Sequence, residues 1–597
     1  MDNVVRGMLS TRGGRLQRLA SAEFCLPAPA HRSSLVDALL SMVCWGSVSC
    51  PTARWLAKCA LQDGASHPEL SKLAGIGTEG TYPGNTRRDL LRQFMKRTTV
   101  PKCLLVRVPT LDKHNREEPT LQAVLQLPEL LQALWENHKT LLMDQYLGQN
   151  PRGFWEACDS GDPRFQRMHA ITDLPGWEDR TWPFILHGDG GVYAKKTQSS
   201  ILTVSCKSML SLRFKSNILP GFALPKHVRT AAAADGLWRS YIHGLNAAFI
   251  GVHPPQDAFG DCWPHGSPQA TLAGTPICGG EIRIVIWVVT GDLEFFSNEC
   301  RMAHFNSLEP CWLCPISRRP GTPFPITDLS LRAAWKQQLS DSFETDWAGG
   351  HAIASIHGIT RFHFPGDFMH TADGGVSSLL VGSALSELLF DGPFAGTTEE
   401  RLRALWDEIL AAYAVSRSAN RISMLTLSMF WHGAGKWAAF TGKCAETRTM
   451  VYIVRDICRA FHDGSDRDRH RLVCFDRLCS IYDACFRHNL HIPAPDAECI
   501  LEDYDIFLVH YHWLCANGAN KGMLVYNIVP KVHMLWHICF LSRYTNPTAC
   551  WAYEFEDYVG TVIDAAKGCM SGTPLAMVGT KVLQNFLLEL NIRLHRG

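Results

Sequence analysis

Two aspartates, Asp189 and Asp292, each follow a run of apolar residues that is typical of a buried strand. The runs read WPFILHGDGG and EIRIVIWVVTGD. A carboxylate at the end of a rigid strand is held in place, and two on neighbouring strands can share a divalent cation. Two such cations about 3.5–4 Å apart activate a water or a 3′-hydroxyl for attack on a phosphodiester. Asp and Gly also commonly form turns after strands, and this is the alternative interpretation of the pair.

A second group of residues has the spacing of a zinc site. Cys300, His304, Cys311 and Cys314 follow Asp292 in the pattern C-x3-H-x6-C-x2-C. Thiolates and imidazoles at such spacings bind zinc tetrahedrally. The pattern therefore predicts a structural zinc knuckle, with four ordinary residues of a Cys-rich chain as the alternative.

Further candidate side chains lie in the C-terminal half of the chain. In PGDFMHTADGGV, Asp367 is positioned to cap a helix and His370 follows three residues later. His533 and His537 are four residues apart and share one face of a helix. They lack the glutamate of an HExxH metalloprotease motif, so we expect structural histidines near the active site. Three acids begin the next helical segment: Glu554, Glu556 and Asp557.

The elements that must position these residues differ along the chain. Strand-like runs dominate from Trp182 to Asp292, whereas the pattern from about 368 to 530 is mostly helical. No run of about 18 apolar residues is present, so we expect no membrane partner. The N-terminal stretch VVRGMLSTRGGRLQRLASAEF is poor in acids, a composition that a mitochondrial transit peptide shares with a disordered basic terminus.

Charge composition limits how the chain could bind nucleic acid. The 597 residues carry 58 Lys+Arg against 57 Asp+Glu, a formal net charge of +1. A nucleic-acid site must therefore be a local basic patch. One basic cluster could contact DNA phosphates, although a solvated helix face is the alternative. Its residues are Arg87, Arg88, Arg92, Lys96 and Arg97.

Taken in order, the segments from about residue 182 to the end resemble the transposase of CACTA-type (En/Spm) DNA transposons. The Plavaka and Kyakuja–Dileera–Zisupton transposases are related groups. HGDGG is similar to the family's first catalytic Asp block, and VTGDLEFF with EPCWLCP is similar to its second. PGDFMHTADGGVSSLLVGSALSELL resembles its D-x-M-H helix and GKCAETRTMV its Ala-Glu-x-Arg segment. PKVHMLWHICF and CWAYEFEDYVGTV resemble the terminal His-containing helix and the block where the last catalytic acid is expected.

The resemblance implies an α/β fold, with an RNase H-like core interrupted by a large all-helical insertion and a mixed, mainly helical N-terminal region. It implies a catalytic triad of Asp189, Asp292 and Glu556 that binds two Mg²⁺ or Mn²⁺ ions, with Glu554 or Asp557 as alternatives for the third acid. The expected activity is metal-dependent DNA strand cleavage and strand transfer. Transposon ends and target DNA are the expected partners, together with a homo-oligomer and a nuclear location. A catalytically inactive transposon-derived protein that binds DNA or protein is the alternative function.

These patterns divide the chain into five expected parts. They are a basic, partly irregular N-terminal region over 1–110, a helical linker region over 111–180, the first part of the core with the C-x2-C knuckle over 181–345, the helical insertion over 346–530 and the last part of the core over 531–597.

Overall fold

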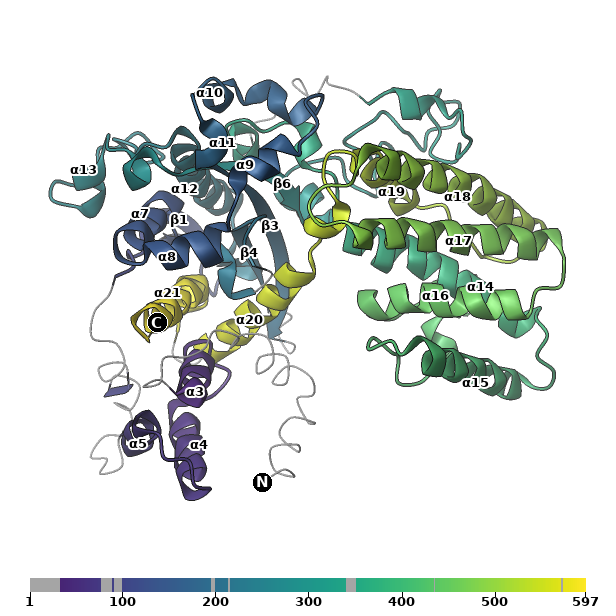
Figure 1. The fold of residues 1–597 in the computed structure, drawn as a ribbon, viewed down its shortest axis with the longest axis horizontal. Coiled ribbons are helices and arrows are strands. Elements are labelled where there is room, and N and C mark those ends of the chain that lie inside the picture. Colours follow the sequence, from purple (N-terminus) through teal and green to yellow (C-terminus); the bar gives the residue numbers. More distant parts are fainter. Residues whose placement is uncertain are drawn as a thin grey trace.

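The computed structural model describes residues 33–76, 89–90, 99–194, 199–212, 215–339, 351–433, 435–570 and 573–596. Within these ranges the protein is a mixed α/β fold in which one six-stranded sheet lies beside a group of long helices (Figure 1). The basic cluster predicted from Arg87 to Arg97 lies outside the described residues. None of the helices in the described ranges is long and apolar enough to cross a membrane.

The strand order in the sheet is β1-β2-β5-β4-β3-β6. Neighbouring strands are antiparallel except β3 and β6, which run parallel, and helix α12 (Ala231–Ile250) connects β5 to β6. The strands are β1 (Leu104–Leu111), β2 (Glu117–Val124), β3 (Thr181–Ala194), β4 (Ser199–Ser208), β5 (Leu219–Pro225) and β6 (Arg283–Thr290).

The two apolar runs that precede Asp189 and Asp292 are the buried strands β3 and β6. Their parallel pairing explains their continuous burial, because both faces of such a pair are covered by helices. Strand β3 does not end at Asp189 as expected. It continues to Ala194 because β4 pairs with it over that whole length.

The expected boundary at residue 110 divides a hairpin, and the region 111–180, expected to be a helical linker, begins with a strand. Strands β1 and β2 form a hairpin across that boundary, and β2 joins β5 at the edge of the sheet. Alternate residues of β1 are buried, which is the period of a strand with one covered face. Helix α7 (Leu127–Asn137) begins only after the hairpin, with Pro128 in its first turn, where proline costs no hydrogen bond.

Helices cover both faces of the sheet, so that the sheet is the middle of three layers. Along β3, His187 stacks on Phe555 of α20 (Tyr553–Cys569), and Gly191 approaches the same helix. Gly188 points to the opposite face and meets Phe295, whose ring neighbours Trp238 of α12. Helix α21 (Val578–Arg596) follows α20 and packs beside it, so the end of the chain returns to the sheet (Figure 1). Shorter helices lie in the connections between these elements: α8 (Lys139–Leu141), α9 (Pro151–Glu156), α10 (His169–Thr172), α11 (Trp177–Arg180) and α13 (Pro268–Leu272).

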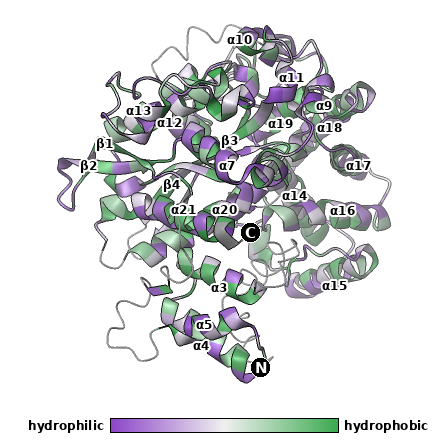
Figure 2. Cartoon of the chain, turned by 60° about the vertical axis from the view of Figure 1, so that its left-hand side comes forward, coloured by the Kyte–Doolittle hydropathy of each residue, from purple (hydrophilic) through white to green (hydrophobic). Residues whose placement is uncertain are grey.

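The long helices between β6 and α19 (Pro530–Leu541) have a hydrophobic core of their own. They are α14 (Ser378–Phe390), α15 (Thr398–Ser416), α16 (Cys444–Ala460), α17 (Asp466–Arg487) and α18 (Ala494–Asn520). Hydrophobic and hydrophilic residues alternate along the ribbons of α15 and α16 in Figure 2, as expected of amphipathic helices, whereas α14 is buried on nearly all sides. A third, small core joins α21 to the N-terminal helices α3 (Ser34–Cys44), α4 (Cys50–Gln62) and α5 (Pro68–Gly75).

Candidate active site and a Cys/His cluster

The pairing of β3 with β6 sets Asp189 and Asp292 side by side. The last paired residues of the two parallel strands are His187 and Thr290, and each aspartate lies two residues beyond them. Asp189 Oδ1 accepts a hydrogen bond from the N–H of Gly190 at 2.6 Å. Asp292 Oδ1 accepts one from the N–H of Phe295 at 2.6 Å, at the turn that follows β6. The two carboxylates are thus held by their local backbone at the same end of the β3–β6 pairing.

Two glycines beside these aspartates are required by close packing. A Cβ added to Gly188 would lie 1.9 Å from Cε2 of the Phe295 ring, and one added to Gly291 would lie 2.5 Å from its Cδ1. Both distances are below any real contact, so the buried ring fits only because both residues are glycine. The Phe295 ring therefore packs directly against the backbone that positions Asp189 and Asp292.

Of the three acids at the start of α20, Glu556 is the one that faces the aspartates. Its Oε1 lies 3.5 Å from Nε2 of His370, and its charge acts on Asp189. Glu554 instead forms an ion pair with Lys207, a buried lysine of β4. Asp557 is exposed on the helix surface. The three acidic side chains point in different directions, because residues one or two positions apart in a helix do not share a face.

Asp367 connects the helix after it to the start of α20. Its buried carboxylate accepts hydrogen bonds from the backbone N–H and the Nδ1–H of His370, both at 2.7 Å. Its other oxygen accepts one from the N–H of Ala552 at 2.8 Å. The expected capping role is thus present at the π-helix Met369–Ser377, which leads into α14. The same carboxylate orients His370 so that its Nε2 points to Glu556.

The electrostatics of this group are those of crowded, partly buried carboxylates. Burial, followed by the charges of Glu556 and Asp292, raises the pKa of Asp189 to about 8. Burial also raises the pKa of Glu556. Burial alone would lower the pKa of His370, but Asp367 and the other nearby carboxylates outweigh it and raise that pKa to about 9. Closely placed carboxylates are the oxygen ligands that a hard divalent cation requires, so this donor set fits Mg²⁺ or Mn²⁺.

One lysine near the acids was not found by sequence reasoning. Lys531, in the first turn of α19, has its Nζ 3.4 Å from the carbonyl oxygen of Gly374, and Asp292 and Asp367 both act on its charge. Lys531 belongs to no cluster or spacing pattern, so only the fold brings it to the acids. Lys226 lies on the other face of β3, since a Cβ on Gly190, which points to the same face as Gly188, would be 2.8 Å from its Nζ.

A buried polar node connects the long helices to the first turn of α20. Asp373 is fully buried and accepts hydrogen bonds from Arg448 of α16 at 2.9 Å and from the Tyr553 hydroxyl at 2.6 Å. The Tyr482 hydroxyl donates to the same carboxylate. Because Tyr553 precedes Glu556 by three residues, this node contributes to the position of Glu556.

The expected zinc knuckle differs from the Cys/His group that the structure forms. Cys311 and Cys314 lie together with His533 and His537 of α19, and the ligand atoms of all four lie within 4.8 Å of one another. Cys300 is not part of this group and is buried in the core beside the sheet. His304 is exposed, and its Nδ1 accepts a hydrogen bond from the N–H of Asn306. The two histidines thus replace Cys300 and His304, because folding brings α19 against the C-x2-C turn. Among the described residues, it is the one group of three or more His, Cys, Asp or Glu side chains whose ligand atoms all lie within 4.8 Å of one another. The carboxylates of Asp189, Asp292 and Glu556 are therefore more widely spaced than the Cys/His group.

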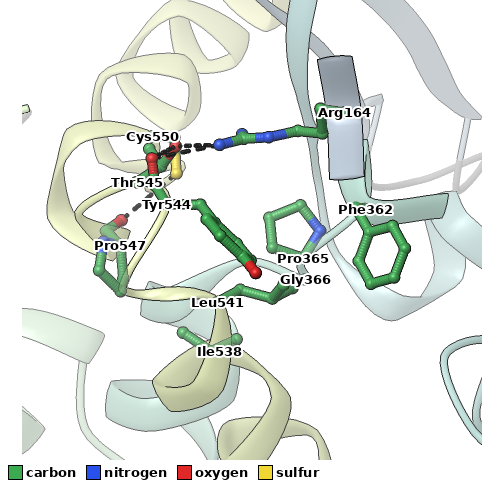
Figure 3. Close-up of a pocket in the computed structure, with 10 residues that line it drawn as sticks. All are labelled: Arg164, Phe362, Pro365, Gly366, Ile538, Leu541, Tyr544, Thr545, Pro547 and Cys550. Carbon is green, nitrogen blue, oxygen red and sulfur yellow. Dashed lines mark hydrogen bonds between the residues drawn. The ribbon is translucent and has the colours of Figure 1, made fainter. Parts of the chain in front are cut away.

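A separate small pocket lies where the chain passes from α19 to α20 (Figure 3). Arg164 forms one side of it and donates hydrogen bonds to the Tyr544 carbonyl at 3.2 Å and the Thr545 hydroxyl at 2.9 Å. The same guanidinium forms a buried ion pair with Asp162 and donates to the Trp287 carbonyl of β6. Arg164 therefore connects the segment before α20 to the strand that leads to Asp292.

No protein-family model matches this sequence, and no curated protein matches it. The function must therefore be argued from the site itself.

Proposed function

We propose that this protein is a DDE transposase-like enzyme that cleaves and joins DNA strands with two Mg²⁺ or Mn²⁺ ions, and that its sheet is an RNase H-like core. The observation that carries the proposal is the position of Asp189 and Asp292, each two residues beyond the last pair of two adjacent parallel strands, with Glu556 on the helix that covers their face. Three antiparallel strands followed by a helix and a fourth strand parallel to the first are consistent with such a core. The long helices between β6 and α20 correspond to the proposed insertion.

In the proposed reaction Asp189, Asp292 and Glu556 would hold the ions. When bound, the ions would activate the attacking hydroxyl and stabilise the leaving oxygen of the phosphodiester. The protein's own contribution is to hold the carboxylates in place through Gly190, Phe295 and the packing of α20.

The positive groups around the acids complete the proposed site. His370 carries a proton at neutral pH, because its pKa is about 9, and it orients Glu556 through their 3.5 Å contact. Lys531 lies where positive charge would bind a phosphate beside the scissile bond.

The test uses purified full-length protein, labelled duplex DNA or supercoiled plasmid, and Mg²⁺ or Mn²⁺. We expect metal-dependent nicking or strand transfer that D189N, D292N and E556Q each reduce by at least about 100-fold, because loss of a residue that only supports a metal ligand already costs about 10–100-fold. D557N is the matched control, because Asp557 is an exposed acid of the same helix. Equal activity in all four variants would contradict the proposed triad.

Metal binding separates this function from its alternative. Titration of Mn²⁺, followed by calorimetry, should show binding that D189N and D292N weaken. Binding of Mn²⁺ and DNA without cleavage would favour an inactive DNA-binding protein with the same site. Absence of acid-dependent Mn²⁺ binding would refute both the metal site and the enzyme.

A further inference from the structure

Four buried or half-buried side chains from two distant segments converge on one point beside the sheet. Cys311 Sγ lies 3.4 Å from Nε2 of His537, and Cys314 Sγ lies 3.2 Å from Nε2 of His533. The two Nε2 atoms are 2.9 Å apart. We propose that Cys311, Cys314, His533 and His537 bind one structural zinc ion, which joins the C-x2-C loop to helix α19.

The donor set selects the metal. Two thiolates and two imidazole nitrogens are the ligands of tetrahedral structural zinc, and they exclude Mg²⁺ and Ca²⁺, which require oxygen ligands. The C-x2-C turn supplies two ligands from one loop, and the i,i+4 pair supplies two from one face of α19. A set of two plus two ligands with no carboxylate and full coordination is typical of a closed, structural site.

The surroundings of the cluster favour a bound ion over four uncharged side chains. Both histidines are 1% exposed, and their Nδ1 atoms have no hydrogen-bond partner in the described part of the chain. The ring of Trp335 packs against His533 with centroids 4.3 Å apart and covers one side of the site. Because the Nδ1 atoms have no partner there, both rings make their polar contacts through Nε2, toward the two sulfurs and toward each other. A zinc ion would be coordinated by these two Nε2 atoms and the two sulfurs.

The position of the site indicates what the ion does. Cys311 and Cys314 belong to the segment that follows Asp292 and β6, whereas α19 leads through the Arg164 contacts to α20 and Glu556. Residues of both large hydrophobic cores meet here, since Trp335 and Cys314 belong to one core and Trp312 to the other. The ion therefore crosslinks the chain segments that carry the second and third acids. Its presence does not depend on whether those acids catalyse a reaction.

The first test measures zinc in the purified full chain and in five single variants by elemental analysis. We expect about one zinc per chain in the wild type, a complete loss in C314S and H537N, and full retention in C300S and H304N. These control variants remove the same residue types from the same loop but lie outside the cluster. D189N, in the acid cluster, should also retain zinc, which separates this site from the proposed catalytic one.

A second measurement covers the case in which the ligand variants fail to fold. Exchange of zinc for Co²⁺ in the wild-type chain should produce thiolate-to-cobalt charge-transfer bands and the intense visible bands of a tetrahedral ion. A wild-type chain that contains neither zinc nor cobalt would overturn the proposal. Loss of metal from C300S and H304N but not from C314S and H537N would overturn it in favour of the knuckle expected from the sequence.

Discussion

The buried contact between Arg448 and Asp373 gives the sharpest test of how the long helices support α20. The Asp373 carboxylate is fully buried, and Arg448 is the one cation bonded to it among the described residues. Substitution R448M keeps most of the side-chain length but leaves this carboxylate without its counter-charge. Breaking a buried ion pair from one side costs about 3–5 kcal/mol. The Tyr482 and Tyr553 hydroxyls still donate to Asp373, so we expect the lower end, about 3 kcal/mol.

The loss of unfolding free energy in R448M should depend on pH, and the pKa of Asp373 gives the direction of that dependence. Burial raises the pKa of Asp373 to about 6, and Arg448 opposes that rise. In R448M the pKa therefore rises further, and the folded protein takes up a proton at a higher pH than the wild type does. Protonation removes the unpaired charge, so the loss of stability should be largest near pH 8 and smaller near pH 5.5. Each unit of additional pKa shift changes the difference by about 1.4 kcal/mol.

The assay is urea unfolding of wild type and R448M at both pH values, followed by tryptophan fluorescence. Trp551 lies under the Arg448 guanidinium, 5.1 Å from its centre, so the signal includes this node. The matched control is R459M, because Arg459 is on the same helix and pairs with Asp476 while half exposed. That variant should cost no more than about 1 kcal/mol at either pH. An R448M loss equal to that of R459M, or a loss that does not change with pH, would refute the reasoning.

Three further predictions concern single side chains. E554Q removes the counter-charge of the buried Lys207 and should lower the free energy of unfolding, measured by urea unfolding, by about 3 kcal/mol. An effect below about 1 kcal/mol would mean that the ion pair is solvated. G188A places a Cβ 1.9 Å from Cε2 of the Phe295 ring and should lower the free energy of unfolding by about 1–3 kcal/mol and weaken Mn²⁺ binding. Thermal unfolding and calorimetry measure the two effects, and unchanged values would show that the ring can move aside. Burial, followed by the charge of Arg301, lowers the pKa of His351 from 6.5 to about 4. Folding therefore favours the neutral imidazole, and the stability that this adds to the folded protein is lost as the pH falls from about 6.5 toward 4. H351Q should therefore lose less stability than the wild type between about pH 7 and pH 5 in urea unfolding, and parallel curves would contradict this.

Local patterns in the sequence were sufficient where the chemistry depends on neighbours along the chain. The apolar runs before Asp189 and Asp292 predicted β3 and β6, since continuous burial of a strand is visible in its composition. The capping position of Asp367 and the shared face of the two α19 histidines also follow from spacing alone. The β1–β2 hairpin was not predicted, because it crosses the expected boundary at residue 110 and the second strand has few apolar residues.

The sequence by itself thus determined the two strands that precede Asp189 and Asp292 and supplied the candidate side chains. Only the tertiary structure decided which of these residues meet. It selected Glu556 over Glu554, whose charge is used by Lys207, and it replaced Cys300 and His304 by the histidines of α19. The physical reason is that strand register and helix packing bring together side chains hundreds of residues apart, whereas spacing along the chain reports only the contacts within one element.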